Sequence, residues 1–240
     1  MSVGKVCMKY GSFKTEEKFK NKVIDSALRH VIFDGWSANT FDKVCSEKVF
    51  SSGEVWQMFP RGGIDLALAF HERDNKKFEL SFLDQSENDH NKKTRDRIKS
   101  AINLRLKIAS MNREAVKRSI ALFSTPMYFV DGTRTLWNTA DLIWNLIGDS
   151  STDINWYSKR LILSAIYSGA LVIWMDDETP DFIDTQEFVS RRINDVMAFE
   201  KIKSKIRSIP ILKDVVKKFE DKSQDFFTLK QKFPGWKQKQ

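Results

Sequence analysis

Cysteine, proline and glycine are scarce in this chain of 240 residues. The only two cysteines, Cys7 and Cys45, lie far apart and form no CxxC pair, which argues against a disulfide framework or a cysteine zinc site and fits a reducing cytosol. The five prolines and ten glycines are well spaced, so helices are favoured. No linker rich in Gly, Pro or Ser divides the chain, which predicts one domain with an appendage.

The motifs that usually accompany catalysis are also missing. The sequence contains no P-loop, GxGxxG, GxSxG or HExxH pattern. Glu87 and His90 form a single ExxH in a polar stretch, whereas a di-iron carboxylate centre needs two such motifs and further glutamates. We therefore expect no catalytic residue, no metal and no cofactor. An enzyme that binds a metal through Glu87 and His90 is kept as an alternative.

A long hydrophobic run is absent too, because the most apolar segment, from Leu161 to Met175, is shorter than the roughly 20 residues of a membrane-spanning helix. We expect it to form a central helix that is buried on most sides. Trp156 and Tyr157 precede this run. Both are large enough to anchor a core, but neighbouring residues on a helix face different directions, so a role in a protein interface is an equal alternative.

Apolar residues recur at three- and four-residue steps along the chain, and no useful segment has the two-residue period of a strand. In residues 127–147 the apolar positions that give the helix its core face are Leu136, Trp137, Ala140, Ile143, Trp144 and Ile147. The prediction is an all-α fold. Thr15 is expected to cap the first helix, Gly148 to end the helix before the central one, and Pro180 to end the central helix. Asp184 with Glu187 is expected to form a capping box after Pro180. Helices are expected at about residues 15–31, 38–48, 54–59, 64–83, 98–111, 113–124, 127–147, 161–175 and from 184 onward.

Three short helices joined by tight turns near the N-terminus indicate a helix-turn-helix-like unit. A DNA-binding regulator is therefore an alternative, with phosphate contacts from Lys43, Lys48 and Arg61. The segment that would enter the major groove, residues 51–59, offers Glu54 and Gln57 but no Lys or Arg. A packing unit without DNA is therefore favoured.

The net charge of +8 is concentrated at the C-terminus. Residues 1–200 carry 28 Lys/Arg and 28 Asp/Glu, whereas residues 201–240 carry 12 and 4. Within this tail, apolar residues at helical spacing alternate with lysines, so an amphipathic helix is expected from Ser208 onward. Such a helix could dock on its own domain or lie on an anionic membrane. The candidate membrane-contacting residues are Ile209, Leu212, Lys213, Val216, Lys217 and Phe219.

Small side chains recur at four-residue spacing in the central helix, at Ser164 and Ser168 and again at Ala165 and Gly169. Close helix packing explains this pattern, and room for an apolar ligand is the alternative. The pattern alone favours packing.

Several stretches resemble the Coq-nine family of lipid-binding accessory proteins in ubiquinone biosynthesis. They are FDGW at 33–36, FPRGGIDL at 59–66, GDSSTDINWYSKR at 148–160, IY at 166–167 and WMDDE at 174–178. The resemblance covers about residues 18–200, and its central motif is long and specific. It implies a fold like that of TetR-type regulators, commonly dimeric, with an apolar cavity for isoprenoid lipids and no chemistry of its own.

The same resemblance implies that the protein presents quinone precursors to the di-iron hydroxylase of the pathway, without nucleic acid. It places a partner surface at Ile143, Asp153, Trp156 and Tyr157, and it favours the membrane role for the C-terminal tail. Helices of the large bundle, including the central one, would line the lipid cavity. The lipid-contacting candidates are Leu161, Ala165, Ser168, Gly169 and Val172.

The expected organisation is a flexible N-terminus at 1–14, the helix-turn-helix-like unit at 15–63, the lipid-binding bundle at 64–207 and the basic tail at 208–240. The N-terminus has no signal-peptide apolar core, and Glu16 with Glu17 argues against an acid-poor transit peptide such as mitochondrial members carry. We therefore expect a bacterial cytoplasmic protein that is peripheral to the inner membrane.

Overall fold

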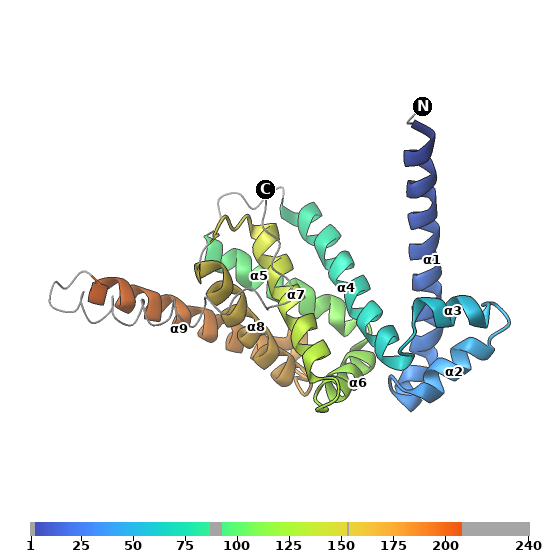
Figure 1. Cartoon of the computed structure of the whole chain (residues 1–240). Helices are drawn as coiled ribbons and strands as arrows, with labels where there is room; N and C mark the ends of the chain where they lie inside the picture. Colours follow the sequence, from blue (N-terminus) through green and yellow to red (C-terminus); the bar gives the residue numbers. More distant parts are fainter. Residues whose placement is uncertain (1–2, 87–92, 153, 208–240) are drawn as a thin grey trace. The chain divides into compact units, whose positions relative to one another are not determined.

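The structure is a computed structural model that describes residues 3–86, 93–152 and 154–207, with side chains for 15–86, 93–152 and 154–198. These residues are all-helical and contain no strand, as predicted. The helices are α1 (Val3–Asp34), α2 (Ala38–Ser46), α3 (Ser52–Met58), α4 (Gly63–Ser86), α5 (Thr94–Ser110), α6 (Arg113–Phe123), α7 (Phe129–Ile147), α8 (Ile154–Trp174), the short 3-10 helix η1 (Pro180–Phe182) and α9 (Ile183–Arg207) (Figure 1).

The chain divides into two compact units, Met1–Ser190 and Arg191–Gln240. The first unit holds α1 to α8, η1 and the beginning of α9. In the second unit, the described residues continue α9, where Arg192 Nη2 lies 3.1 Å from Asp195 Oδ2 one helical turn away. The predicted division at residues 15, 64 and 208 stays a prediction.

Helix α2 packs against α1 and α3, and both α1 and α2 also pack against helices that follow. Val23, Ala27 and Val31 form the buried stripe of α1, at four-residue spacing. Phe41 and Val55 contribute the buried face of α2 and α3. Ser37 caps α2, because its hydroxyl accepts a hydrogen bond from the amide of Thr40 at 3.3 Å. Three helices joined by tight turns are therefore confirmed.

Gly62 and Gly63 lie at the start of α4, where each position favours glycine for a different reason. Gly62 has a φ of +66°, which favours glycine. A Cβ on Gly63 would lie 2.7 Å from the carbonyl oxygens of Trp36 and Ser37, which are backbone atoms. Gly63 therefore allows the N-terminus of α4 to touch the loop that precedes α2.

The close approach at Gly63 predicts a large effect for one methyl group. Gly63→Ala is expected to lower the free energy of unfolding by about 1–3 kcal/mol, because the backbone of two segments must shift. Gly53→Ala is the control, since the nearest atom to its added Cβ is 3.9 Å away. This control should be neutral or slightly stabilising. Urea unfolding followed by circular dichroism measures both, and equal effects would contradict the explanation.

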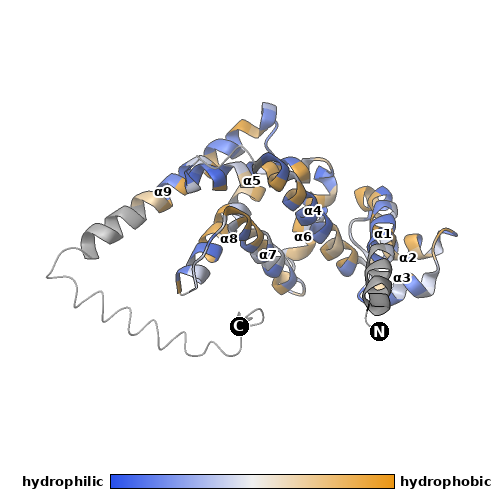
Figure 2. Ribbon diagram, turned by 90° about the horizontal axis from the view of Figure 1, so that it is seen from above, coloured by the Kyte–Doolittle hydropathy of each residue, from blue (hydrophilic) through white to orange (hydrophobic). Residues whose placement is uncertain are grey.

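Helices α4 to α8 form a bundle in which α4 packs against α5 and α7, and α8 packs mainly against α7. Figure 1 shows α7 and α8 side by side as consecutive helices, joined by the turn after Gly148. Polar and apolar residues alternate around α4, α5 and α6 (Figure 2), as expected for helices with one buried side. The bundle core includes Phe70, Phe78, Ile102, Ile143 and Trp174.

Three predictions about helix ends are wrong. Helix α1 begins at Val3, so Thr15 lies inside it and is not its N-cap. Helix α8 ends at Trp174, and Pro180 lies in η1 rather than at the end of α8. Asp184 lies within the first turn of α9 rather than at its N-cap, and the carboxylate of Asp177 binds the amide of Thr185 at the start of this helix.

Candidate functional site

The candidate site is the turn between α7 and α8, where α7 ends at Gly148. Gly148 adopts a φ of +86°, the left-handed conformation predicted for a residue that follows a helix. Its amide donates a hydrogen bond to the carbonyl of Asn145. This ending sends the chain back so that α8 packs along α7.

The buried side chain of Arg160 links α7 and α8 next to this turn. Arg160 of α8 is only 1% exposed. Its Nε donates to Asp141 of α7, and its Nη1 lies 3.2 Å from Asp149 Oδ2 in the turn. Its Nη2 also donates to Asn145 Oδ1 at 3.2 Å. Each guanidinium nitrogen therefore has a partner, which a buried charge requires.

Asp149 is the centre of the turn's hydrogen bonds. Its Oδ1 accepts from Lys159 Nζ at 2.7 Å and from the hydroxyl of Ser151 at 2.8 Å, while its Oδ2 faces Arg160. Burial alone would raise the pKa of Asp149, but the hydrogen bonds from Lys159, Ser151 and Arg160 hold it below its ordinary value. The carboxylate therefore remains ionised and fixes the loop to α8.

Three aromatic rings gather on the surface beside this ion cluster, and we call Trp137, Trp156 and Tyr157 the aromatic cluster. The ring of Trp156 lies 4.7 Å from that of Tyr157 and 5.8 Å from that of Trp137, measured between centroids. All three side chains are half-buried. The Arg160 guanidinium stacks on the Trp156 ring at 3.9 Å. The buried guanidinium of Arg160 therefore supports the inner side of the aromatic cluster.

Sequence reasoning found Trp156 and Tyr157 but assigned Trp137 to the core face of its helix. Trp137 precedes the motif, on α7, and it reaches the other two rings only because α8 folds back on α7. Of the other predicted partner residues, Ile143 is fully buried, so its side chain has no exposed surface for a partner to contact. Asp153 lies outside the described residues. The partner role itself stays a prediction.

The predicted lipid-contacting residues of α8 lie on its outer side. Leu161 and Val172 are 64% and 57% exposed, and Ala165 between them is also exposed. Ser168 and Gly169 are half-buried, and a Cβ on Gly169 would lie 2.9 Å from the ring of Phe188. The helix is therefore covered by α7, by α5 and, at Gly169, by Phe188 of α9, while Leu161, Ala165 and Val172 remain exposed.

The inner face of α8 carries a different set of residues. The buried ones are Arg160, Leu163, Ile166, Tyr167, Ala170, Leu171 and Trp174. Lipid contact by Leu161, Ala165 and Val172 therefore requires a surface site on α8, and that contact stays a prediction. An open groove of about 730 Å³ lies elsewhere, between α1 and α3, and includes none of these residues. It is lined by Thr15, Glu16, Phe19, Lys20, Glu54, Gln57 and Met58.

The end of α8 is closed by a second polar junction. Arg113 Nη2 donates to the carbonyls of Trp174 at 2.7 Å and Asp177 at 2.8 Å, which satisfies groups that a helix end leaves without partners. Asp177 in turn accepts hydrogen bonds from the amides of Thr179 and Thr185, each at 2.9 Å, and from both hydroxyls. This carboxylate fixes the start of α9 to the end of α8.

Asp177 gives a pH-dependent prediction. Burial would raise its pKa, but the hydrogen bonds from Thr179 and Thr185 lower it from 3.8 to about 2. A depressed carboxyl pKa stabilises the fold above the ordinary value, and this contribution is lost as the pH falls from about 4 towards 2. Asp177→Asn should therefore cost about 1–2 kcal/mol at pH 7, and the difference from the parent protein should shrink below pH 4.

Asp176→Asn is the matched control for this effect, because its side chain is exposed and next to Asp177 in the chain. Thermal unfolding at a series of pH values measures the two variants. A constant difference from pH 7 to pH 2.5 for Asp177→Asn would show that its ionised form does not stabilise the fold.

The other residues predicted to bind DNA, a metal or a membrane are paired with carboxylates, are exposed, or lie outside the described residues. Lys43 is paired with Asp34, and Arg61 with Asp65 and Asp131 at 2.9 and 3.1 Å. Lys48 is exposed. Glu87 and His90 lie outside the described residues, and among the described ones no group of His, Cys, Asp and Glu could hold a metal ion. The tail residues Ile209, Leu212, Lys213, Val216, Lys217 and Phe219 also lie outside.

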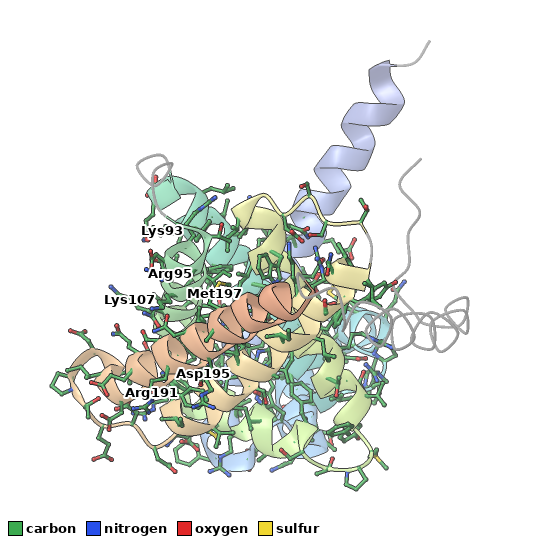
Figure 3. The ribbon with its side chains drawn as sticks, turned by 90° about the vertical axis from the view of Figure 1, so that its left-hand side faces the viewer. Lys93, Arg95, Lys107, Arg191, Asp195 and Met197 are labelled. Atoms are coloured by element: carbon green, nitrogen blue, oxygen red, sulfur yellow. The ribbon has the colours of Figure 1, made fainter. Side chains whose placement is uncertain are left out.

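Basic side chains also project from the outer side of α5. Lys93, Arg95 and Lys107 are exposed there (Figure 3), and Lys99 is half-buried. Arg97, also on α5, donates a hydrogen bond to the carbonyl of Ile147 at 2.9 Å, so the start of α5 lies near the end of α7. Within the described residues, no helix is long and apolar enough to cross a membrane.

The fold and the site together define an all-helical protein whose bundle carries an aromatic surface supported by buried ion pairs. The COQ9 family model matches residues 129–200, which contain α7, α8 and the turn between them. The chain is thus similar to the COQ9, or Coq-nine, family over this segment.

Similarity to individual relatives extends over most of this chain. It is 28% identical to the human ubiquinone biosynthesis protein COQ9, mitochondrial, over 204 residues, which are 82% of this chain and 63% of that protein. It is 26% identical to a probable ubiquinone biosynthesis protein coq9, mitochondrial, of Dictyostelium discoideum over 193 residues, 79% of this chain and 63% of that protein. The chain thus spans slightly less than two thirds of the length of these relatives.

Proposed function

We propose that this protein is a non-enzymatic lipid-binding protein of ubiquinone biosynthesis that presents isoprenoid quinone intermediates to the di-iron hydroxylase of the pathway. The observation that carries the proposal is the aromatic cluster on the α7–α8 turn, stacked on the buried Arg160. Tyr, Trp and Arg are the residues that most often dominate protein interfaces. The names of the COQ9 relatives support the pathway.

The lipid-binding part of the proposal is supported by the exposed apolar side of α8. Leu161, Ala165 and Val172 recur at four and seven residues and so lie along one line of the helix. Exposed apolar stripes on soluble helices mark places where another apolar surface binds. A lipid chain, supplied by the membrane, would cover this stripe and remove it from water.

Membrane contact would come from the basic tail at 208–240, supported by the exposed basic side of α5. Near an anionic bilayer each Lys or Arg contributes about 1 kcal/mol. The proposed cellular site is the bacterial cytoplasm, peripheral to the inner membrane, and the proposed assembly is a homodimer with a TetR-like arrangement of α1–α3 and the bundle. No observation favours the DNA-binding alternative, because Lys43 and Arg61 are already paired with carboxylates.

Native mass spectrometry of the purified protein tests lipid binding. We expect a mass increase that matches an isoprenoid or phospholipid, and its loss in Leu161→Glu, which places a charge on the α8 stripe. Leu80→Glu is the control, because Leu80 is an equally exposed leucine on α4, at 65%. A protein without bound lipid, or equal loss in both variants, would contradict the proposed lipid site.

Liposome flotation tests the membrane contact separately. The full chain should float with vesicles that contain phosphatidylglycerol, and the form that lacks residues 208–240 should float less. Equal flotation of both forms would favour docking of the tail on its own domain.

A further inference from the structure

The connection between α6 and α7 exposes several large apolar side chains together, and we call residues 124–130 the α6–α7 tip. Met127, Phe129 and Val130 are 77%, 63% and 66% exposed. The tip follows the end of α6 and includes the first turn of α7. From residue 119 to residue 130 the sequence contains no charged residue. Exposed apolar side chains that gather at one place mark an interaction site, whereas single ones do not.

The polar groups of the tip are paired within the tip and with its neighbouring helix ends. The amide of Tyr128 donates to the carbonyl of Thr125 at 3.1 Å, and the amide of Gly132 donates to the carbonyl of Tyr128 at 3.0 Å. The hydroxyls of Ser124 and Thr125 donate to carbonyls at the end of α6, each at 2.7 Å. Backbone groups without partners are costly outside water, so this pairing lowers the cost of entering an apolar phase.

The tip is held firmly by the helices on both sides of it. Gly132 is buried, and a Cβ there would lie 2.6 Å from Phe123 Cβ, so the end of α6 touches the start of α7. Arg61 links Asp131 of α7 to Asp65 of α4, at 3.1 and 2.9 Å. Figure 1 shows the tip at the lower edge of the first unit, where α6 leads into α7. A firmly held loop therefore presents these apolar side chains to the outside.

The charges beside the tip favour an anionic surface. Asp131 and Asp65 are only 15% and 16% exposed and are paired with Arg61. Arg134, one helical turn after Val130, is exposed, and no carboxylate among the described residues pairs with it. An arginine in this position can bind lipid phosphates while the apolar side chains one turn away enter the bilayer.

The place of the tip in the bundle agrees with uptake of a lipid by α8. The tip precedes α7 and the α7–α8 turn follows it, so they lie at opposite ends of this helix. Helix α8 returns along α7, so its C-terminal end, with the exposed Val172, lies towards the tip (Figure 1). A bilayer at the tip would adjoin this end of the α8 stripe and leave Trp156 and Tyr157, at the other end, open to a protein partner.

We propose that the α6–α7 tip inserts Met127, Phe129 and Val130 into the headgroup region of an anionic bilayer. The inference rests on the proposed function, in which the bilayer supplies the lipid, and it adds a membrane contact that is separate from the basic tail. Stable anchoring at a membrane takes two signals, because one alone gives marginal, reversible binding. A bilayer suits an exposed tip, since fluid lipid can surround it, whereas a protein partner must supply a complementary pocket.

A fluorescent probe tests insertion in the full-length protein. Met127→Cys is combined with Cys7→Ser and Cys45→Ser and labelled with NBD, whose emission increases and shifts to shorter wavelength in apolar surroundings. We expect this change when vesicles of phosphatidylcholine and phosphatidylglycerol are added. Val49→Cys in the same background is the control, because Val49 is 78% exposed between α2 and α3. The probe at residue 49 should not respond.

A charge substitution measures how much the tip contributes to binding. Met127→Glu with Val130→Glu should weaken binding to these vesicles at least about tenfold, because the two side chains can no longer leave water. Val49→Glu with Leu80→Glu adds the same charge at two other exposed apolar positions. It should change the affinity less than about twofold, since charges away from the bilayer are screened. Vesicle sedimentation gives the affinities, and circular dichroism checks the fold.

Three results would overturn insertion of the tip. If the protein binds vesicles but the probe at residue 127 does not respond, or if both double variants weaken binding equally, the tip is not inserted while membrane contact stands. If the full-length protein binds no vesicles, insertion and the proposed membrane contact fall together. A probe response that needs no vesicles and grows with protein concentration would show that a second copy of the chain covers the tip.

Discussion

Replacing Arg160 by alanine is expected to lower the free energy of unfolding by about 3–5 kcal/mol, the range for removing one partner of a buried ion pair. The reason is that Asp149, which is nearly fully buried, and the half-buried Asp141 would lose their shared cation. The same change removes the guanidinium that stacks on Trp156. Chemical denaturation at pH 7 gives the value directly.

Two comparisons make this prediction specific. Lys20→Ala breaks the exposed pair with Glu16, whose atoms are 3.6 Å apart one turn away, and should cost only about 0.2–0.5 kcal/mol. Arg160→Lys keeps the charge, but a lysine cannot reach Asp141, Asp149 and Asn145 at once. Its loss of unfolding free energy should therefore lie between the losses for Lys20→Ala and Arg160→Ala. A loss below about 1 kcal/mol for Arg160→Ala would mean that the turn is not held by these ion pairs.

Replacing Trp156 by alanine is expected to weaken binding to the proposed partner, the di-iron hydroxylase, by about 30-fold or more, equivalent to at least about 2 kcal/mol. Trp156 contacts both other rings of the aromatic cluster, and the Arg160 guanidinium stacks on it. Its loss would remove one of the two indole rings from this surface, together with its contacts to Trp137 and Tyr157. Biolayer interferometry with the immobilised hydroxylase measures the change.

Trp56 supplies a matched control for this experiment. It is an exposed tryptophan of α3, 50% exposed, that also packs edge-on against another ring, that of Phe41 at 4.7 Å. Trp56→Ala should leave the affinity within about twofold, since surface residues outside an interface contribute little. Equal weakening by both variants would place the partner surface elsewhere or indicate a general loss of folding, which circular dichroism distinguishes.

The α7–α8 turn shows how far sequence reasoning reached at the site. Gly148 was predicted as the residue after a helix because glycine tolerates a positive φ, and the structure confirms it. Trp156 and Tyr157 were identified by their place in a specific motif. Trp137 was assigned to a core face instead, because its contact with the other two rings depends on how α7 and α8 pack.

Helix caps show the same limit. Ser37 and Gly148 each cap a helix within a few residues of their own position. Local spacing was therefore enough to predict that Gly148 ends its helix. Asp177 binds the start of α9 from the end of the preceding helix, eight residues before Thr185. The capping-box pattern at Asp184 and Glu187 was the stronger local signal, but the carboxylate of Asp177 accepts the hydrogen bond from the Thr185 amide. Competition between caps is decided by the path of the connecting loop.

The sequence by itself determined that this protein is helical and where its chemically distinctive turn lies, because helical period, glycine and aromatic motifs act over a few residues. The tertiary structure alone decided which face of α8 is covered and how its charges pair. Leu161 and Leu163 are two residues apart in an apolar run, yet the packing of the bundle buries only the second. Asp141, Asp149 and Arg160 likewise become one cluster only when α8 returns along α7, since long-range packing sets these distances.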